Sequence, residues 1–229
     1  MLALALGFQG TAAWANCTTS GSSTTCTAAG GAHGAKVGGG SSGNNQQVTV
    51  QAGARIEVGD SAAISVGNNS QVQIQGGAVV QSTVVTPPSS GTLHANTVEG
   101  VASNTIDIAP NAQVLAKGTN LAAEALGLSG AGNTVNNRGT IQADQAAAIW
   151  VDVNAANSAN TINNYGTIET RRNGGDATAI GSTRDASSTG AGVTLRNHSG
   201  GRIVGHLDFA GGDDSVVLEG GSSISGHLN

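Results

Sequence analysis

Hydrophobic and polar residues alternate in short runs from Val48 onward. The run at 48–56 aligns at an offset of 24 with the run at 72–80, and every apolar position is matched. Alternation with a period of two is typical of strands that bury one face. The pair Gly76-Gly77 indicates a tight bend between two such strands. No helical period occurs in this part of the chain, so the pattern predicts an all-β fold.

The clearest repeat joins segments 133–143 and 160–170. They lie 27 residues apart and share seven of eleven residues, including Asn-x-Gly-Thr-Ile. A fixed period of this size is typical of stacked repeats, because a single unit cannot bury its apolar face without a neighbour of the same shape. We therefore expect residues about 27 apart to lie one above another.

Following one inward position through these repeats gives a series of seven anchors: Val50, Ile74, Ile108, Val135, Ile162, Leu195 and Leu218. A second class of short apolar strands occurs at 63–66, 125–128, 148–151 and 177–180. Two or three short strands per repeat predict a single-stranded parallel β-helix of about seven coils over 48–229. The longer repeats are expected to loop out at 84–93, which holds Pro87-Pro88, and at 171–176 and 185–192, since an extra residue within a strand would turn inward side chains outward.

The same period places three asparagines inward, one per coil: Asn137, Asn164 and Asn197. Their spacing would be about 4.8 Å from coil to coil. A stack of amides can satisfy its own hydrogen bonds, whereas a single buried Asn would be costly. We predict an internal asparagine ladder.

The residues that follow these asparagines are Arg138, Tyr165 and His198, and they should form an outward column. A cation and two rings on a Ser/Thr/Gly-rich surface would make a contact strip for a glycan or a protein. The alternative interpretation is a column of solvated ladder residues, because three side chains make a small patch.

Composition supports a thin core. The 229 residues are 38% hydrophobic but only 2% aromatic, so Val, Ile, Leu and Ala must fill the interior. Disorder is the rival interpretation, but the periodic placement of apolar residues argues against it. The net charge of -5, with no run of Lys or Arg, argues against a nucleic-acid partner.

The first fifteen residues resemble the end of a secretory signal peptide. A short apolar run precedes Ala13-Trp14-Ala15, which has the small-x-small form of a cleavage site. The basic region that normally opens a signal is absent, which indicates either a truncated start or a misassigned initiator. A frayed apolar N-terminus of a cytosolic protein is the alternative. We predict cleavage before Asn16 and export of the remainder.

Cys17 and Cys26 follow directly and are the only cysteines. An even count in an exported chain indicates an oxidising compartment and predicts one small disulfide loop. The loop lies within a Gly/Ser/Thr-rich lead-in, 16–47, for which we expect a disordered or loop-rich conformation.

The Ala-x-Ala signal, the Gly-Thr-Ile repeats at 139–141 and 166–168, and the segment 211–218 resemble the passenger region of bacterial autotransporters. The resemblance covers 48–229 and implies a right-handed parallel β-helix carried to the cell surface by type V secretion. It also implies an outer-membrane β-barrel translocator as partner. That barrel is absent from this chain, which we interpret as an N-terminal passenger fragment. Passengers of this family serve as adhesins, proteases, lipases or toxins, so the resemblance specifies no activity.

Three motifs could carry chemistry. Gly59-Asp60-Ser61-Ala62 resembles a serine-nucleophile context, but the nearest histidine, His94, lies about a coil away, and a polar turn is the simpler interpretation. Gly211-Gly212-Asp213-Asp214 resembles half of one calcium-binding repeat and is better read as a turn. His206 and His227 should stack one coil apart without a third metal ligand. We predict no catalytic, cofactor or metal residues.

Four acidic residues that could serve a polysaccharide-cleaving β-helix are scattered along the chain: Asp144, Asp152, Glu169 and Asp176. Such enzymes gather acids and bases in one groove. The sequence therefore favours a non-enzymatic adhesin-like or structural stalk module. A β-helix enzyme, and a spacer scaffold for a distal domain, are the alternatives.

Overall fold

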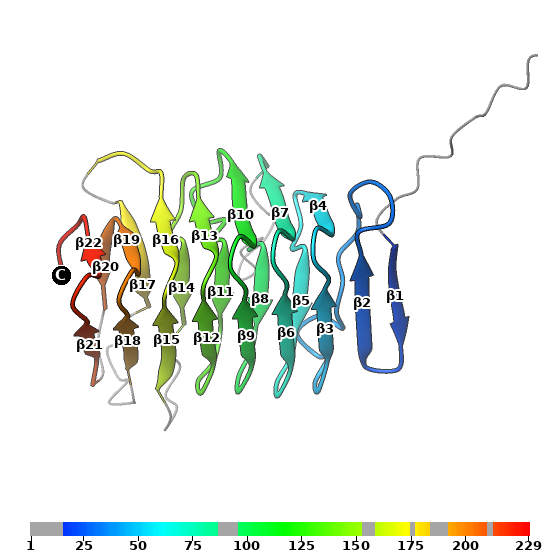
Figure 1. Cartoon of the computed structure of the whole chain (residues 1–229), viewed down its shortest axis with the longest axis horizontal. Coiled ribbons are helices and arrows are strands. Elements are labelled where there is room, and N and C mark those ends of the chain that lie inside the picture. Colours follow the sequence, from blue (N-terminus) through cyan, green and yellow to red (C-terminus); the bar gives the residue numbers. More distant parts are fainter. Residues whose placement is uncertain (1–15, 87–95, 153–158, 175–176, 184–191, 210–212) are drawn as a thin grey trace, which may run out of the picture.

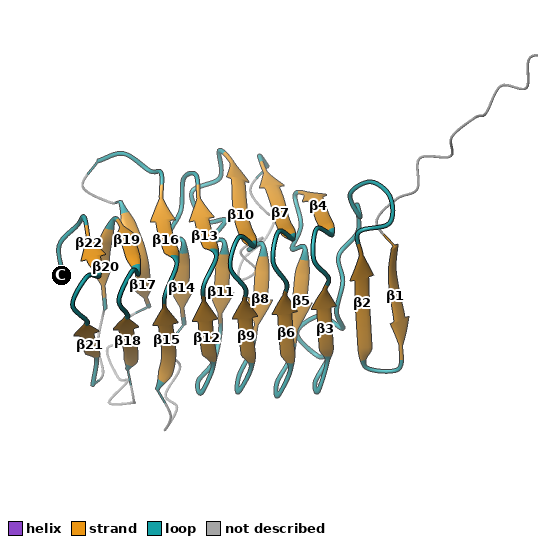
Figure 2. Cartoon of the chain, in the orientation of Figure 1, coloured by secondary structure: helices purple, strands orange, loops and turns teal. Residues whose placement is uncertain are grey.

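The structure is a computed structural model of the chain, and it describes residues 16–86, 96–152, 159–174, 177–183, 192–209 and 213–229. The predicted signal 1–15, the Pro87-Pro88 loop and most of 185–192 lie outside these residues. All regular structure in the described part is strand (Figure 2). No helix that is long and apolar enough to cross a membrane occurs there.

Three sheets run the length of the molecule. The first contains β1 (Asn16–Ser20), β2 (Ser23–Thr27), β3 (Gln47–Val50), β6 (Gln71–Ile74), β9 (Thr105–Ile108), β12 (Thr134–Asn137), β15 (Asn160–Asn164), β18 (Val193–Asn197) and β21 (Ser215–Leu218). The second contains β4 (Arg55–Gly59), β7 (Val79–Val84), β10 (Gln113–Gly118), β13 (Thr140–Ala143), β16 (Thr167–Thr170), β19 (Arg202–Val204) and β22 (Ser223–Ile224). The third contains β5 (Ile64–Val66), β8 (Val98–Gly100), β11 (Leu126–Leu128), β14 (Ile149–Val151), β17 (Thr178–Ser182) and β20 (His206–Asp208).

Each coil contributes one strand to each sheet, and the coils stack side by side along the long axis (Figure 1). Every described strand pair is parallel except β1 with β2. From β3 onward the described chain makes six coils of three strands and a seventh that has β21 and β22. The predicted all-β parallel β-helix is confirmed, while its handedness stays a prediction.

The core is a set of aliphatic columns. In the second sheet the inward position of successive coils is aliphatic at every strand from β4 to β19, and all of these side chains are fully buried: Ile56, Val80, Val114, Ile141, Ile168 and Ile203. No aromatic side chain belongs to the buried core of the described residues. A coil only three strands round encloses little volume, so branched aliphatic residues fill it without rings.

The predicted anchor series needs one correction. Ile108 pairs with Asn137, whereas Val135 pairs with Ile106. At the other end Leu218 pairs with Asn197 rather than with Leu195. The anchors Val50, Ile74, Ile108 and Leu218 therefore belong to the asparagine column, and Val135, Ile162 and Leu195 belong to the neighbouring inward column. The error is a slip of two residues, which keeps the same side chains facing inward and leaves the alternation unchanged.

The lead-in is attached to the coils. It is loop-rich, as predicted, but β2 pairs in parallel with β3, and single bridges join His33 to Ile56 and Val37 to Ile64. The Val37 side chain is buried in the core. Segment 28–46 therefore forms an irregular coil ahead of β3, and the β1–β2 hairpin lies at its outer end (Figure 1).

Cys17 and Cys26 form the predicted disulfide, directly opposite each other in the β1–β2 hairpin with a Cα–Cα distance of 3.9 Å. Cys26 is fully buried. β1 pairs only with β2 in the described structure, so this outer strand is held by the β1–β2 ladder and by the cross-link.

We expect the double variant Cys17→Ala/Cys26→Ala to loosen the hairpin alone. Loss of a ten-residue cross-linked loop removes about 2.5 kcal/mol of loop-closure stabilisation, and in a stacked fold the loss stays local. Hydrogen exchange should accelerate in 16–27 and stay unchanged in β12 and β15. Unchanged exchange in 16–27 would contradict this expectation. Reduction of the native chain breaks the same disulfide without a substitution and is the matched control.

Candidate functional site

The asparagine ladder occupies the interior at the end of the first sheet. Asn137 Nδ2 donates to Asn164 Oδ1 at 2.8 Å, and Asn164 Nδ2 donates to Asn197 Oδ1 at 2.8 Å. All three side chains are fully buried. Each Nδ2 also donates to a backbone carbonyl at the start of the second sheet in the next coil, namely those of Thr167, Arg202 and Ser223. The ladder thus ties two sheets and successive coils together.

Two of these asparagines also make the shortest turns between the first and second sheets. The Gly139 N–H donates to Asn137 Oδ1 at 3.1 Å, and the Gly166 N–H donates to Asn164 Oδ1 at 3.3 Å. This is the Asx-turn geometry, in which a side chain replaces a backbone acceptor. A Cβ on Gly166 would lie 2.2 Å from the Gly139 carbonyl oxygen, so only glycine lets the coils approach this closely.

The other turns at this corner are longer and close differently. Four residues separate the strands, and the third adopts a positive φ: Gly53, Gly77, Asn111, Gly200 and Gly221. A left-handed residue at this position is what a type II turn requires. Three of these four-residue turns follow aliphatic residues, Val50, Ile74 and Ile108. Asparagine precedes each two-residue turn instead, because the Asx-turn uses its side chain.

A second column of polar residues was not anticipated from the sequence. At the start of the first sheet, the backbone N–H of one coil donates to a side-chain oxygen of the next: Gln46 to Ser70, Ser70 to Asn104, Asn104 to Asn133, and Asn133 to Asn160. Asn104, Asn133 and Asn160 are buried. The signal was the Asn-Thr dipeptide that recurs at 104–105, 133–134 and 160–161.

Asp214 continues this column two coils further on. Its Oδ1 accepts the Val193 N–H at 2.6 Å. Partial burial raises the pKa of the Asp214 carboxyl, although the hydrogen bond from Val193 opposes the shift. The predicted turn motif at 211–214 thus contributes a backbone contact through Asp214, while Gly211 and Gly212 lie outside the described residues.

The predicted strip of Arg138, Tyr165 and His198 is assembled as one column. The Tyr165 and His198 rings stack with centroids 3.9 Å apart and an interplanar angle of 5°. The Arg138 guanidinium carbon lies 4.9 Å from the Tyr165 centroid. His198 Nδ1 lies 2.8 Å from Glu219 Oε1, a fourth member that the sequence analysis missed. These contacts occupy ring faces within the column, so a partner would meet mainly ring edges and charged ends.

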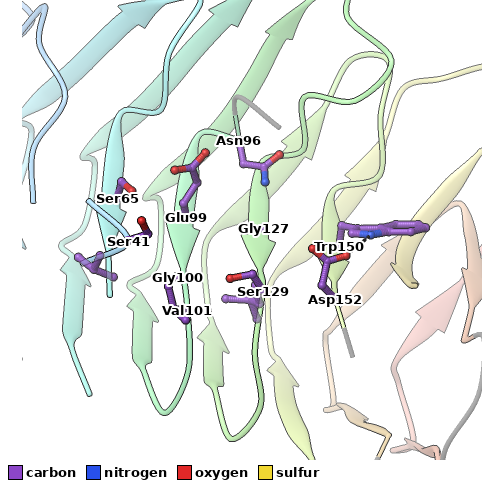
Figure 3. Close-up of a pocket in the computed structure, with 12 residues that line it drawn as sticks. Ser41, Ser65, Asn96, Glu99, Gly100, Val101, Gly127, Ser129, Trp150 and Asp152 are labelled. Carbon is purple, nitrogen blue, oxygen red and sulfur yellow. Dashed lines mark hydrogen bonds between the residues drawn. The ribbon is translucent and has the colours of Figure 1, made fainter. Parts of the chain in front are cut away.

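A pocket of about 70 Å³ opens on the outer face of the third sheet (Figure 3). One outward position on successive strands supplies Ser65, Glu99, Gly127 and Trp150 in register. The remaining lining residues come from strand ends and nearby loops: Ser41, Val66, Asn96, Gly100, Val101, Leu128, Ser129 and Asp152. A larger cavity of about 460 Å³ among the described residues also contains Trp150 and two carboxylates, Glu124 and Asp208, but Arg172 lines it as well.

The acidic residues that could have served an enzyme are indeed spread over different faces. Asp144 lies 3.3 Å from Lys117 Nζ at the second sheet, and Glu169 accepts from Gln142 Nε2 on the same sheet. Asp152 belongs to the third-sheet pocket, and Asp176 lies outside the described residues. The structure does not gather the three described side chains in one groove.

The remaining motifs make local contacts. Asp60 Oδ1 accepts the N–H groups of Val85 and Thr86, and these hydrogen bonds lower the pKa of the Asp60 carboxyl. His206 and His227 stack with centroids 3.7 Å apart. Across the described ranges no three His, Cys, Asp or Glu side chains are placed to share a metal ion.

No protein family, no curated protein and no solved structure matches this chain. Its class therefore follows from its own geometry. Three parallel sheets with inward aliphatic and asparagine columns make it a parallel β-helix protein.

Proposed function

We propose that this chain is an exported, non-enzymatic passenger module of the bacterial autotransporter type, which serves at the cell surface as an adhesin-like stalk. The observation that carries the proposal is the unbroken parallel stack from β2 to β22. Eight first-sheet strands at about 4.8 Å each make a rod roughly 34 Å long between its outer strands, with polar residues along its flanks. Such a rod holds contact residues away from a membrane.

The Cys17–Cys26 disulfide supports export, because structural disulfides persist in oxidising compartments. The sequence before it has the form of a signal cleavage site. Type V secretion would require an outer-membrane translocator as partner.

A host glycan or a matrix protein is the proposed surface partner. The column of Arg138, Tyr165 and His198 is one contact strip for it, since it presents a guanidinium beside two stacked rings. Replacing all three by Ala should reduce adhesion of the chain to immobilised matrix proteins. Unchanged adhesion would remove the strip from the proposal.

Export is tested on the chain as it is made in a bacterial cell. We expect the mature N-terminus at Asn16, Cys17 and Cys26 oxidised, and degradation by protease added to intact cells that carry the translocator. An uncleaved chain with reduced cysteines, protected inside intact cells, would contradict the proposal. The variant Ala15→Arg, which blocks a small-residue cleavage site, is the matched control.

A further inference from the structure

Trp150 lies at one side of the third-sheet pocket. In register, Gly127 precedes it on β11 and Gly181 follows it on β17. A Cβ on Gly181 would lie 2.4 Å from Trp150 Cζ3, so the indole leans over this glycine. On the other side, a Cβ on Gly127 would lie 1.9 Å from Asn96 Nδ2. The two glycines therefore leave room for the ring and for the amide to lie against the sheet.

The polar groups around the ring are held in place by hydrogen bonds. Trp150 Nε1 and Thr183 Oγ1 both donate to Asp152 Oδ1, each at 3.1 Å. Asn96 is nearly buried, and its Oδ1 accepts the Glu124 N–H at 3.0 Å. Figure 3 shows Glu99 to one side of Gly127, and Trp150 with Asp152 to the other. Fixed polar groups beside an apolar surface are the usual composition of a small-molecule site.

The charge of the pocket limits its ligand. Glu99 and Asp152 line it, and none of the described lining residues is Lys, Arg or His. An anion would be repelled, so acidic or sulfated groups do not fit. Carboxylates accept hydrogen bonds strongly from hydroxyl and ammonium groups. Tryptophan contributes a large rigid apolar surface and attracts cations.

Size points to a single ring. A cavity of about 70 Å³ has room for only a few waters, so it favours a ligand of one ring over a chain of rings. A pyranose has one apolar face of C–H groups, which matches the tryptophan ring. Its rim of hydroxyls matches the two carboxylates and the amide.

We propose that this pocket binds one neutral or amino sugar residue of a glycan. The inference deepens the proposed adhesin-like function by naming a ligand class, and it adds a second contact surface on the third sheet, apart from the strip that follows the first-sheet strands. Glu99 and Asp152 accept hydroxyl or ammonium hydrogens, Asn96 lines the rim, and Trp150 packs against the sugar ring.

The test uses the fluorescence of Trp150 as its probe. Trp14 and Trp150 are its only tryptophans, so Trp14→Phe in the full chain leaves Trp150 as the sole indole fluorophore. We expect a saturable fluorescence change with glucose, galactose, mannose, glucosamine or N-acetylglucosamine, and none with sialic acid or heparin. The variants Glu99→Gln and Asp152→Asn should each weaken binding about tenfold, as loss of a charge-assisted hydrogen bond predicts.

Glu57→Gln is the matched control, since Glu57 is an outward carboxylate of the second sheet paired with Arg55. It should leave the affinity for sugar unchanged.

For Trp150→Leu, saturation-transfer NMR replaces fluorescence and should show loss of sugar contact, with circular dichroism confirming the fold. No response to any sugar, or a response only to choline or to sialic acid, would overturn the proposal. Either result leaves the export proposal to its own test, the mature N-terminus and surface exposure.

Discussion

The variant Gly166→Ala should lose about 3 kcal/mol of unfolding free energy. Its new Cβ would lie 2.2 Å from the Gly139 carbonyl oxygen and 2.8 Å from the Arg138 carbonyl carbon. Both are backbone atoms, so no side chain can turn aside. The same carbonyl of Gly139 accepts the Thr167 N–H, and moving the coils apart would stretch this bond. Urea denaturation followed by circular dichroism measures the loss.

The matched control is Gly59→Ala. No atom lies within 4 Å of a Cβ built on Gly59, and its φ is not left-handed. We expect its unfolding free energy within about 0.5 kcal/mol of the native value. If Gly166→Ala and the native chain have the same midpoint of urea denaturation, the coils do not approach each other closely at this turn.

The variant Asn164→Ala should also lose about 3 kcal/mol. It removes the acceptor of the Asn137 amide and of the Gly166 N–H, and the donor to Asn197 Oδ1. These buried groups cannot recover the lost bonds from water, because the asparagines of the ladder are fully buried. Urea denaturation gives the value directly.

Asn163→Ala is the control for this change. The Asn163 side chain points outward, is half-buried, and donates only to Asn136 Oδ1 at 2.9 Å. Water can replace that bond, so we expect a loss below about 1 kcal/mol. Equal losses for Asn163→Ala and Asn164→Ala would show that the inward ladder has no special role.

The fold could be predicted because side-chain alternation reports directly which residues face inward. Its register could not be predicted fully, because a slip of two residues preserves every inward assignment. Val135 was aligned with Ile108 on apolar character, yet the structure pairs Ile108 with Asn137. An asparagine takes an aliphatic position there, since its side chain closes a two-residue turn.

Because of the same two-residue slip in register, the sequence did not predict that Glu219 belongs to the candidate site. With Leu218 aligned to Leu195, Glu219 does not fall beside His198; in the true register it does, and their side chains pair at 2.8 Å. The strip itself was predictable because its members follow the repeated asparagines.

The third-sheet pocket was not predictable for a different reason. Trp150 was visible as an outward residue in an apolar strand, but its neighbours come from coils of unequal length and from the lead-in that supplies Ser41. A signal was present in the glycines at the same outward position, Gly127 and Gly181. Their meaning depends on a register that the sequence alone left open.

The central claim is that the coils rise by one strand spacing whatever number of residues they contain. Thr49 and Arg196 lie outward on the first sheet and are joined by five pairings in register, through Gln73, Asp107, Asn136 and Asn163. Spin labels at Thr49 and Arg196 should give a narrow electron-electron distance near 24 Å, and labels at Gln73 and Arg196 one near 19 Å, a step of about 4.8 Å per coil. A broad distribution centred beyond about 40 Å, as for an unfolded segment of this length, would contradict the stacked coil.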